Sequence, residues 1–244
     1  MHPLAALLRR YAYAYTASGD VTRCRELMVD DYELTMGPVT LHGRDTEYLA
    51  AVRKQLRQFP ALGFTVHDLV LGEDRAALRF TEHGRSTRTG TAAAWSGVSL
   101  YRWDGARLTH CGVEQDYASR RRQLETRACQ VVASPAVDPW SVEPAAADRE
   151  AEYAVRAWLE GAGVASLPAG SLDDEHVAPQ DRMVPRDGTV TVLDLFSAGS
   201  RVAFHIRLDG AATTRYVAGI AEVVGGAVAS VRCVTDRLSG WTRR

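Results

Sequence analysis

The feature that most constrains the fold of this chain is an internal repeat. The segment HDLVLGEDRAALRFTEHG at 67–84 aligns without a gap with LDLFSAGSRVAFHIRLDG at 193–210. Both segments carry an aspartate at the second position, an arginine at the ninth and a glycine at the last. Self-similarity with one constant offset is the signature of a duplicated structural unit. The sequence therefore predicts two units of the same architecture in tandem.

Weaker similarity extends the repeat on both sides of this segment. Downstream, residues 96–108 align with 218–230, and residues 113–116 align with 233–236. Upstream, the second copy is shorter than the first, and the missing length matches one helix. We therefore expect the second copy to be degenerate and to lack the third helix of the first copy.

Residue periodicity predicts helices followed by an antiparallel sheet in the first copy. Apolar residues at helical spacing predict a helix over 4–17, a short second helix capped by Asp20, and a third helix that starts after Gly43 and stops at Pro60. Alternating apolar residues then predict four strands. The remaining elements are a hairpin at 32–42, strands at 62–71, 75–83, 91–102 and 107–116, and an arginine-rich helix at 117–126.

The composition excludes several classes of partner. Hydrophobic residues make up 46% and charged residues 24% of the chain, and the formal net charge is −1. A chain without excess positive charge is not expected to bind nucleic acid or an anionic membrane. The amino-terminal apolar run is too short for a signal peptide or a membrane anchor, so we expect a cytoplasmic protein. The four cysteines and seven histidines lack metal-site spacing, so no metal is expected.

A change of composition divides the chain. Residues 130–144 hold three of the nine prolines and have the character of an extended linker. We expect a catalytic or ligand-binding domain at 1–128, a proline-rich linker at 129–144 and a degenerate domain at 145–244. The second domain is expected to begin with a helix near Ala145.

The last strand of the first copy ends in a row of ionisable residues. Alternation places His110, Glu114 and Asp116 on one face of this strand and less polar residues on the other. In a poorly solvated pocket, a carboxylate becomes more basic, as proton abstraction next to a carbonyl requires. In an alternative interpretation, this face turns to solvent or to a partner subunit, and Asp116 caps the helix that starts at Tyr117.

Five motifs occur in the order found in one known family. They are DDY at 30–32, HGR at 42–44, FP at 59–60, YRWDG at 101–105 and D-x-x-x-R-x-x-Q-L at 116–124. With the layout of helices, hairpin, helix and meander, they resemble the SnoaL-like polyketide cyclases of the nuclear transport factor 2-like superfamily. The resemblance covers nearly all of residues 4–124. It implies an α+β fold in which a curved antiparallel sheet wraps around helices to form a cone.

The resemblance also implies a reaction and a set of site residues. In that family the strand-end aspartate acts as general base and acid in a ring closure without metal or organic cofactor, and Asp116 matches its position. Asp116 is therefore the expected base, with Tyr15 and His110 near the substrate carbonyl. The substrate-binding residues expected around them are Tyr11, Trp95, Glu114, Phe80 and Tyr48.

Two positions depart from the family pattern. Arg88 stands in the loop 84–90 where the family often carries a histidine. The early hairpin carries Leu34, Thr35 and Met36 where related steroid isomerases carry a base, which disfavours a steroid isomerase.

Two classes of function follow from these observations. The first is a cofactor-independent cyclase or isomerase that acts on a polyketide-like or other apolar substrate in the cone of the first domain. The second is a small-molecule-binding or scaffold protein without turnover. In either case the two cone-shaped domains are expected to pair within the chain as a pseudo-dimer. The protein is then expected to be a monomer, or a dimer of two such chains.

Overall fold

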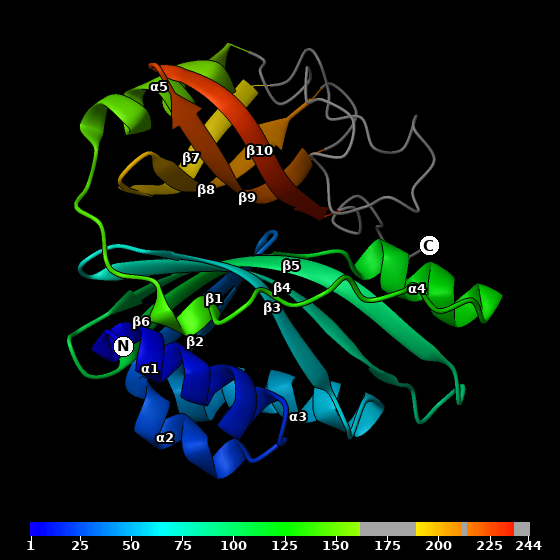
Figure 1. The fold of residues 1–244 in the computed structure, drawn as a ribbon. Coiled ribbons are helices and arrows are strands. Elements are labelled where there is room, and N and C mark those ends of the chain that lie inside the picture. The colour runs from blue at the N-terminus through cyan, green and yellow to red at the C-terminus, as the bar shows by residue number, and fades with distance from the viewer. Residues whose placement is uncertain (162–188, 211–213, 237–244) are drawn as a thin grey trace.

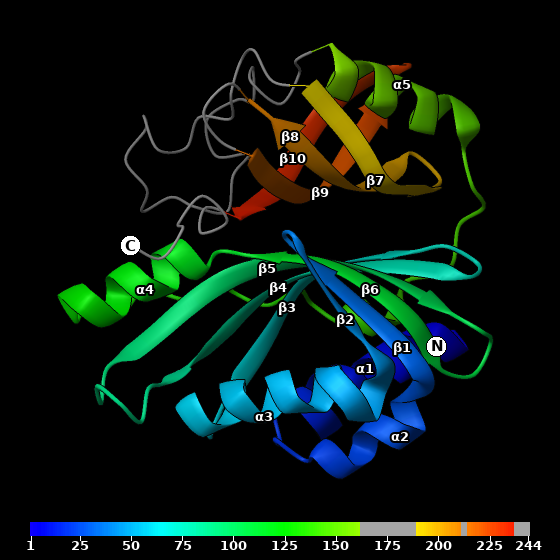
Figure 2. The same cartoon turned by 180° about the vertical axis from the view of Figure 1, so that it is seen from behind.

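The computed structural model describes residues 1–161, 189–210 and 214–236 of the chain. Two β-sheets stack face to face, and each carries helices on its outer side (Figures 1 and 2). The shortened stretch of the second copy falls largely at 162–188, outside the described residues. The expected loss of a third helix there stays a prediction.

Three helical segments pack below the first sheet in Figure 1. Helix α1 (Pro3–Arg9) continues as a π-helical turn (Arg10–Thr16), a 3₁₀ turn (Val21–Arg23) leads into α2 (Cys24–Leu27), and a second π-helical turn (Gly43–Tyr48) leads into α3 (Leu49–Gln58). The 4–17 helix expected from the sequence therefore exists, but its second half is π-helical. Asp20 caps the second segment as expected, because its carboxylate accepts a hydrogen bond from Thr22 N at 3.1 Å.

The first sheet has six strands in the order β2-β1-β6-β5-β4-β3, and β1 pairs with β6 in parallel. Its strands are β1 (Met28–Met36), β2 (Val39–His42), β3 (Gly63–Leu71), β4 (Arg75–Arg85), β5 (Ala92–Trp103) and β6 (Leu108–Gln115). The four predicted meander strands are confirmed to within two residues at each end. Helix α4 (Tyr117–Thr126) follows as predicted.

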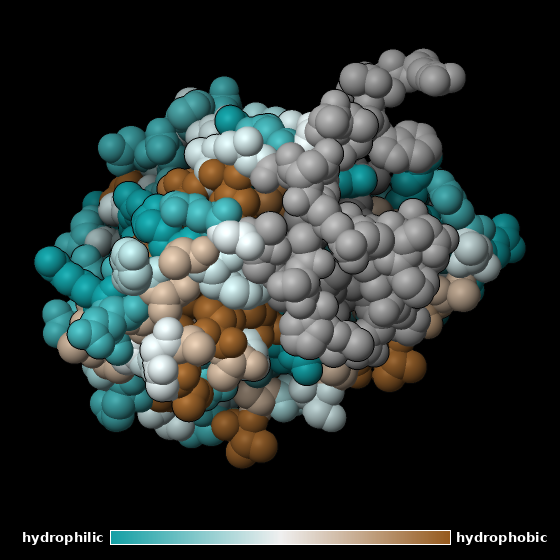
Figure 3. All heavy atoms as spheres, turned by 90° about the horizontal axis from the view of Figure 1, so that it is seen from above, coloured by the Kyte–Doolittle hydropathy of each residue, from teal (hydrophilic) through white to brown (hydrophobic). Residues whose placement is uncertain are grey.

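The second half of the described chain is a helix on a four-stranded sheet. A 3₁₀ turn (Pro139–Ser141) interrupts the linker, and α5 (Arg149–Glu160) precedes β7 (Thr189–Ala198), β8 (Arg201–Asp209), β9 (Thr214–Val224) and β10 (Ala227–Asp236). Ala151, Val155 and Leu159 recur at helical spacing and bury one side of α5 against β8–β10. Seen from above, the described side chains of this outer face are mostly hydrophilic around smaller apolar groups (Figure 3).

The two meanders share strand pairing as well as sequence. The β3–β4 hairpin shifts its register between Val66 and Asp68, and the β7–β8 hairpin shifts between Val192 and Asp194. These positions are equivalent in the repeat, so both copies place an irregularity at the same point. A bulge bends the strand locally and increases its twist. The similarity read from the sequence therefore extends to the shape of the first hairpin.

In the next strand, the pairing corrects the alignment that the sequence suggested. Arg75 and Arg201 are equivalent, and they pair with Arg102 and Glu222 respectively. Arg102 and Glu222 are therefore equivalent positions of the two copies. The alignment of residues 96–108 with the second copy that was predicted from the sequence is shifted by two residues. The shift also aligns the glycines of the two following turns, both of which have positive φ. Turn geometry fixes the register here because few identical side chains remain to do so.

Two reciprocal ion pairs join the sheets. Arg75 pairs with Asp194, and Arg201 pairs with Asp68. Each pair joins the arginine position of one copy to the aspartate position of the other. Such exchange is the contact pattern of an isologous interface between two identical units. Arg102 adds a second contact to Asp194 at 3.1 Å.

An apolar cluster and a buried polar pair fill the space between the sheets. The cluster combines residues of both halves: Val70, Ala77, Val98, Leu100, Phe196, Ala198, Ala203, Ala218, Ile220 and Val234. At its side, His205 Nε2 lies 2.7 Å from Glu114 Oε1, and both residues are at least 98% buried. Gly112 leaves room for the imidazole, because a Cβ at this position would lie 2.9 Å from His205 Nδ1. The outer face of the first sheet is therefore closed to solvent in this region.

Candidate active site

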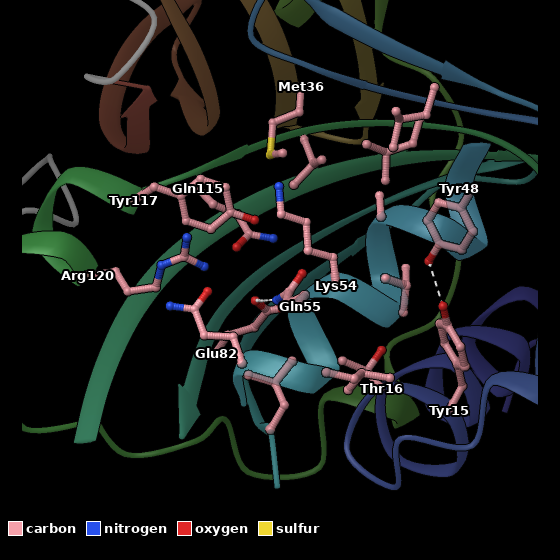
Figure 4. Close-up of a pocket in the computed structure, with 18 of the residues that line it drawn as sticks. Tyr15, Thr16, Met36, Tyr48, Lys54, Gln55, Glu82, Gln115, Tyr117 and Arg120 are labelled. Carbon is pink, nitrogen blue, oxygen red and sulfur yellow. Dashed lines mark hydrogen bonds between the residues drawn. The ribbon is translucent and has the colours of Figure 1, made fainter. Parts of the chain in front are cut away.

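A cavity of about 340 Å³ lies between the helices and the first sheet (Figure 4). For comparison, a cavity of about 150 Å³ holds one benzene molecule, so this one has room for two or three fused rings. Aliphatic and aromatic side chains form most of its wall. The lining residues with a polar group are Tyr11, Tyr15, Thr16, Tyr48, Lys54, Gln55, Gln58, Glu82, Gln115, Tyr117 and Arg120.

The first π-helical turn places three hydroxyl residues in the cavity wall. The wide turn after α1 is closed by a hydrogen bond from Ala17 N to Ala12 O at 3.0 Å. Tyr11, Tyr15 and Thr16 all line the cavity. In an ordinary α-helix, residues four apart share a face but residues five apart do not. The π-helical form therefore explains how Thr16 joins Tyr11, and such turns are frequent at functional sites.

The second π-helical turn ends at Tyr48, which lies next to Tyr15 in the cavity wall. Its hydroxyl lies 3.1 Å from the Tyr15 hydroxyl (Figure 4). Burial raises the pKa of both phenols well above the usual value of 10. Both groups therefore stay protonated at neutral pH. Because the Tyr15 hydroxyl donates its proton in a hydrogen bond to Tyr48, the Tyr48 hydroxyl is the one that can donate a hydrogen bond to a ligand oxygen.

Glu82 is the carboxylate of this cavity. It lies near the end of β4 and is 5% exposed. Its Oε2 accepts hydrogen bonds from Gln55 Nε2 at 2.7 Å and from Trp95 Nε1 at 3.1 Å. Its Oε1 accepts none from the described residues, so one oxygen is fixed by the protein and the other is available to a ligand.

Burial raises the pKa of the Glu82 carboxyl group into the range in which it can gain and lose a proton at physiological pH. Desolvation raises the pKa of Glu82 from 4.5 to about 7, although the charge of Arg120 and the bonds from Gln55 and Trp95 oppose the rise. Desolvation is thus the largest effect and favours the neutral acid. A group with a pKa near 7 exists in both protonation states at neutral pH, as general acid–base catalysis requires.

Arg120 closes the wall beside Glu82. Its guanidinium lies over the rings of Tyr117, Trp95 and Phe59, at 3.9, 4.9 and 5.7 Å from their centroids. The aromatic faces hold the cation by cation–π attraction. Trp95 also donates to Gln115 Oε1 at 2.7 Å. The polar end of the cavity is therefore held rigidly by stacked rings and hydrogen bonds.

The structure does not place Asp116 in this cavity, which contradicts its expected role as the base. Its Oδ1 accepts a hydrogen bond from Ser119 N at 2.9 Å, so it caps α4. This is the alternative that the sequence left open. A side chain that satisfies the first turn of a helix is held at the helix terminus, away from a ligand in the cavity.

His110 and Glu114 also lie away from the cavity. The alternation along β6 is as predicted, but this face turns toward the second sheet, where Glu114 meets His205. The cavity receives the opposite face, through Val113 and Gln115. The prediction had the correct period and the wrong face, because alternation alone does not say which face meets the ligand.

The expected aromatic residues divide into two groups. Tyr11, Tyr15 and Tyr48 line the cavity. Trp95 and Phe80 do not line it but lie behind its wall. Trp95 holds Glu82 in place, and Phe80 stacks on Phe64 at a centroid distance of 4.5 Å.

The sequence contained a signal for Glu82 that the predictions missed. Leu78 and Phe80 alternate on the core face of β4, and Glu82 continues that face two residues later. It also lies directly opposite Trp95 on the neighbouring strand. A carboxylate on the apolar side of a strand, with an indole N–H across from it, indicates a buried and functional acid. No such signal marks Arg120, which the arginine-rich α4 contains beside two others.

Two further classes of site are absent from the part of the chain that the structure describes. No group of three or more His, Cys, Asp or Glu side chains there could hold a metal ion. Within the same residues, no helix has the length and apolar character needed to cross a membrane. The cytoplasmic location stays a prediction.

Comparison with known proteins gives one family match. Residues 8–111 match the model of the SnoaL-like domain. IdmH from Streptomyces antibioticus, a proposed polyketide cyclase, is 21% identical, with a TM-score of 0.45 over 51% of this chain and 99% of that chain. A proposed SnoaL-like polyketide cyclase from Jannaschia sp. CCS1 is 15% identical, with a TM-score of 0.43 over 48% of this chain and 86% of that chain. The comparison with curated proteins gave no match.

A third solved structure is that of a protein with a different designation. AclR from Streptomyces galilaeus, a proposed hydroxylase, is 18% identical, with a TM-score of 0.45 over 49% of this chain and 83% of that chain.

The curved sheet, the helices on one side of it and the cavity between them define a cone-shaped α+β domain. The match to the SnoaL-like domain covers residues 8–111, which is less than half of the chain, and it falls on the part that holds this cavity.

The raised pKa of Glu82 predicts a dependence of stability on pH. The unfolded chain releases this proton near pH 4.5 and the folded chain near pH 7, so between these values the folded state binds more protons and its stability falls as the pH rises. Glu82→Gln removes this loss. We expect the free energy of unfolding of this variant, relative to the wild type, to grow by about 3 kcal/mol from pH 4 to pH 8, measured by urea denaturation.

The matched control is Glu73→Gln, which removes an exposed carboxylate from the β3–β4 turn. It should leave the pH dependence of stability as in the wild type. A Glu82→Gln variant whose stability runs parallel to that of the wild type between pH 4 and pH 8 would contradict the assignment.

Proposed function

We propose that the protein is an acid–base catalyst of the cyclase or isomerase type, acting on an apolar carbonyl compound in the cavity of its SnoaL-like domain. The observation that carries this proposal is the buried Glu82, with a pKa of about 7 and one oxygen without a hydrogen bond from the described protein. The polyketide cyclase designations of IdmH and of the Jannaschia protein accord with it. They belong to those proteins and supply no residue role here.

The arrangement supports a ring closure by proton transfer. Glu82 Oε1 takes a proton from the carbon next to a substrate carbonyl, and the electron pair of that C–H bond moves to form an enolate. The hydroxyl of Tyr48, which accepts a hydrogen bond from Tyr15, donates its own proton in a hydrogen bond to a developing oxyanion. The enolate carbon then attacks a second carbonyl of the same molecule, and the new alkoxide receives the proton that Glu82 holds. Proton and electrons balance without an external oxidant or reductant.

The alternative function is binding without turnover. It shares the cavity and the apolar ligand, but it needs no basic carboxylate. A neutral hydrogen-bonding side chain at position 82 would serve a binding protein as well and would avoid the cost of desolvating a charge. The presence of a carboxylate at this buried position therefore favours catalysis.

Exchange of ketone α-protons in D₂O tests the first chemical step without knowledge of the natural substrate. With 2-tetralone as the probe, we expect the wild type to accelerate exchange, measured by ¹H NMR, with a rate that rises through pH 7 to a plateau. Glu82→Gln should lower the catalysed rate at least about 100-fold, since general base catalysis contributes about 10²–10⁴.

The control for this experiment is Asp116→Asn. Asparagine is as good a helix cap as aspartate, so this variant should stay folded and exchange the ketone at close to the wild-type rate. Loss of exchange in Asp116→Asn, with retention in Glu82→Gln, would return the catalytic role to Asp116 and overturn the proposal.

We further propose that the second half is a degenerate tandem copy that pairs with the first as an internal pseudo-dimer. The proposal is supported by the equivalent register shifts of β3–β4 and β7–β8 and by the exchanged pairs of Arg75 with Asp194 and Arg201 with Asp68. In this arrangement the second copy acts as a scaffold that covers the outer face of the catalytic sheet.

An internal partner removes the need for a second chain on that face. We therefore expect light scattering to give the mass of a monomer, 26.7 kDa, across the micromolar range. An obligate dimer held together through the second half of the chain would contradict the internal pairing.

A further inference from the structure

The cavity contains the one lysine of the chain. Lys54 is the single lysine among 29 basic residues. It is an exposed residue of α3 that also lines the cavity, and Figure 4 shows its side chain extending among the other lining residues. A chain that uses arginine at every other basic position has a strong bias against lysine. A lysine kept within the cavity wall therefore suggests a requirement for a compact ammonium group, which arginine does not supply.

Lys54 has no carboxylate partner among the described residues of the protein. The charged residues of the described cavity wall are Lys54, Arg120 and Glu82. Arg120 lies over three aromatic rings and interacts with Glu82. No ion pair joins Lys54 to any described residue. Below pH 7, where Glu82 is mostly protonated, the cavity carries an excess of positive charge.

We propose that the substrate carries a carboxylate, which Lys54 binds at the solvent-facing side of the cavity while the carbonyl region of the substrate lies at Glu82. This inference rests on the proposed function in taking this cavity as the substrate site. A carboxylate suits a single ammonium group better than a phosphate, because a dianion calls for several cations or backbone N–H groups. The substrate class is thus a free acid with two or three fused or folded rings, and not a neutral ester.

Lys54 is a binding and orienting residue in this account. Its pairing with one end of the substrate fixes which carbon reaches Glu82 at the other end, and orientation of this kind lowers the entropic cost of ring closure. Thr16 is a second polar residue that lines the cavity. Its buried Oγ1 has no hydrogen-bond partner among the described residues. It is available to a polar atom of the ligand.

Equilibrium binding of two isosteric probes tests the inference without any turnover. We choose 2-naphthoate and its neutral analogue 2-naphthamide, and measure dissociation constants by calorimetry at pH 6 and low salt. The wild type should bind the carboxylate about fivefold or more tightly than the amide, the ratio expected for one partly exposed ion pair. This preference should shrink as salt is added.

Four variants separate the local contact from general electrostatics. Lys54→Met should bind both probes equally, with unchanged affinity for the amide, and Lys54→Arg should retain part of the preference. Arg57→Met removes a positive charge from the exposed side of the same helix and should keep the full preference. Glu82→Gln should also keep it, even though its exchange activity is lost.

The outcomes distinguish this inference from the proposed function. Equal affinity of the wild type for the two probes, or no binding of the carboxylate, overturns the carboxylate site and leaves the role of Glu82 intact. An equal loss of preference in Arg57→Met and Lys54→Met also overturns it, because the effect would then come from the overall charge. Loss of exchange activity together with a preserved carboxylate preference in Glu82→Gln supports both assignments.

Discussion

The central strands β4, β5 and β6 of the first sheet are buried on both faces over most of their length, and this double burial constrains the polar groups that they carry. On one face the helices leave a cavity, and on the other the second sheet excludes water through an apolar cluster. A strand that is buried on both faces has no solvent-facing side, so a charged side chain on it loses its hydration and costs free energy. The buried Glu114 is stabilised by its contact with His205. The buried Glu82 avoids the cost of a charge by staying protonated up to about pH 7.

The same constraint links stability and chemistry. A carboxylate that is half ionised at neutral pH costs folding free energy, and a domain with a net stability of about 5–15 kcal/mol must recover that cost elsewhere. The second half of the chain contributes here. Its sheet covers apolar side chains of the first sheet, and its Asp194 pairs with Arg75 and Arg102 of the first sheet. A scaffold of this kind allows a destabilising acid to persist in the cavity.

Much of the fold could be predicted from the sequence because it follows from periodicity and from repetition. The period-two pattern gave the four meander strands, and the repeat marked the positions that exchange ion pairs. The candidate site was harder. Alternation in β6 does not reveal that the face of Glu114 meets the second sheet, and helical spacing does not distinguish the π-helical turn that carries Tyr15 and Thr16. Glu82 was visible in principle, as the residue that continues the face of Phe80.

We infer that burial, and not a neighbouring charge, raises the pKa of Glu82 to near neutrality. The most direct test is an NMR titration of the full chain with ¹³C-labelled glutamate carboxyl groups, with Glu82 assigned by its loss from the spectrum of Glu82→Gln. We expect a carboxyl resonance of Glu82 whose titration midpoint lies near pH 7, well above that of exposed glutamates. A Glu82 resonance that titrates near pH 4.5 would contradict it.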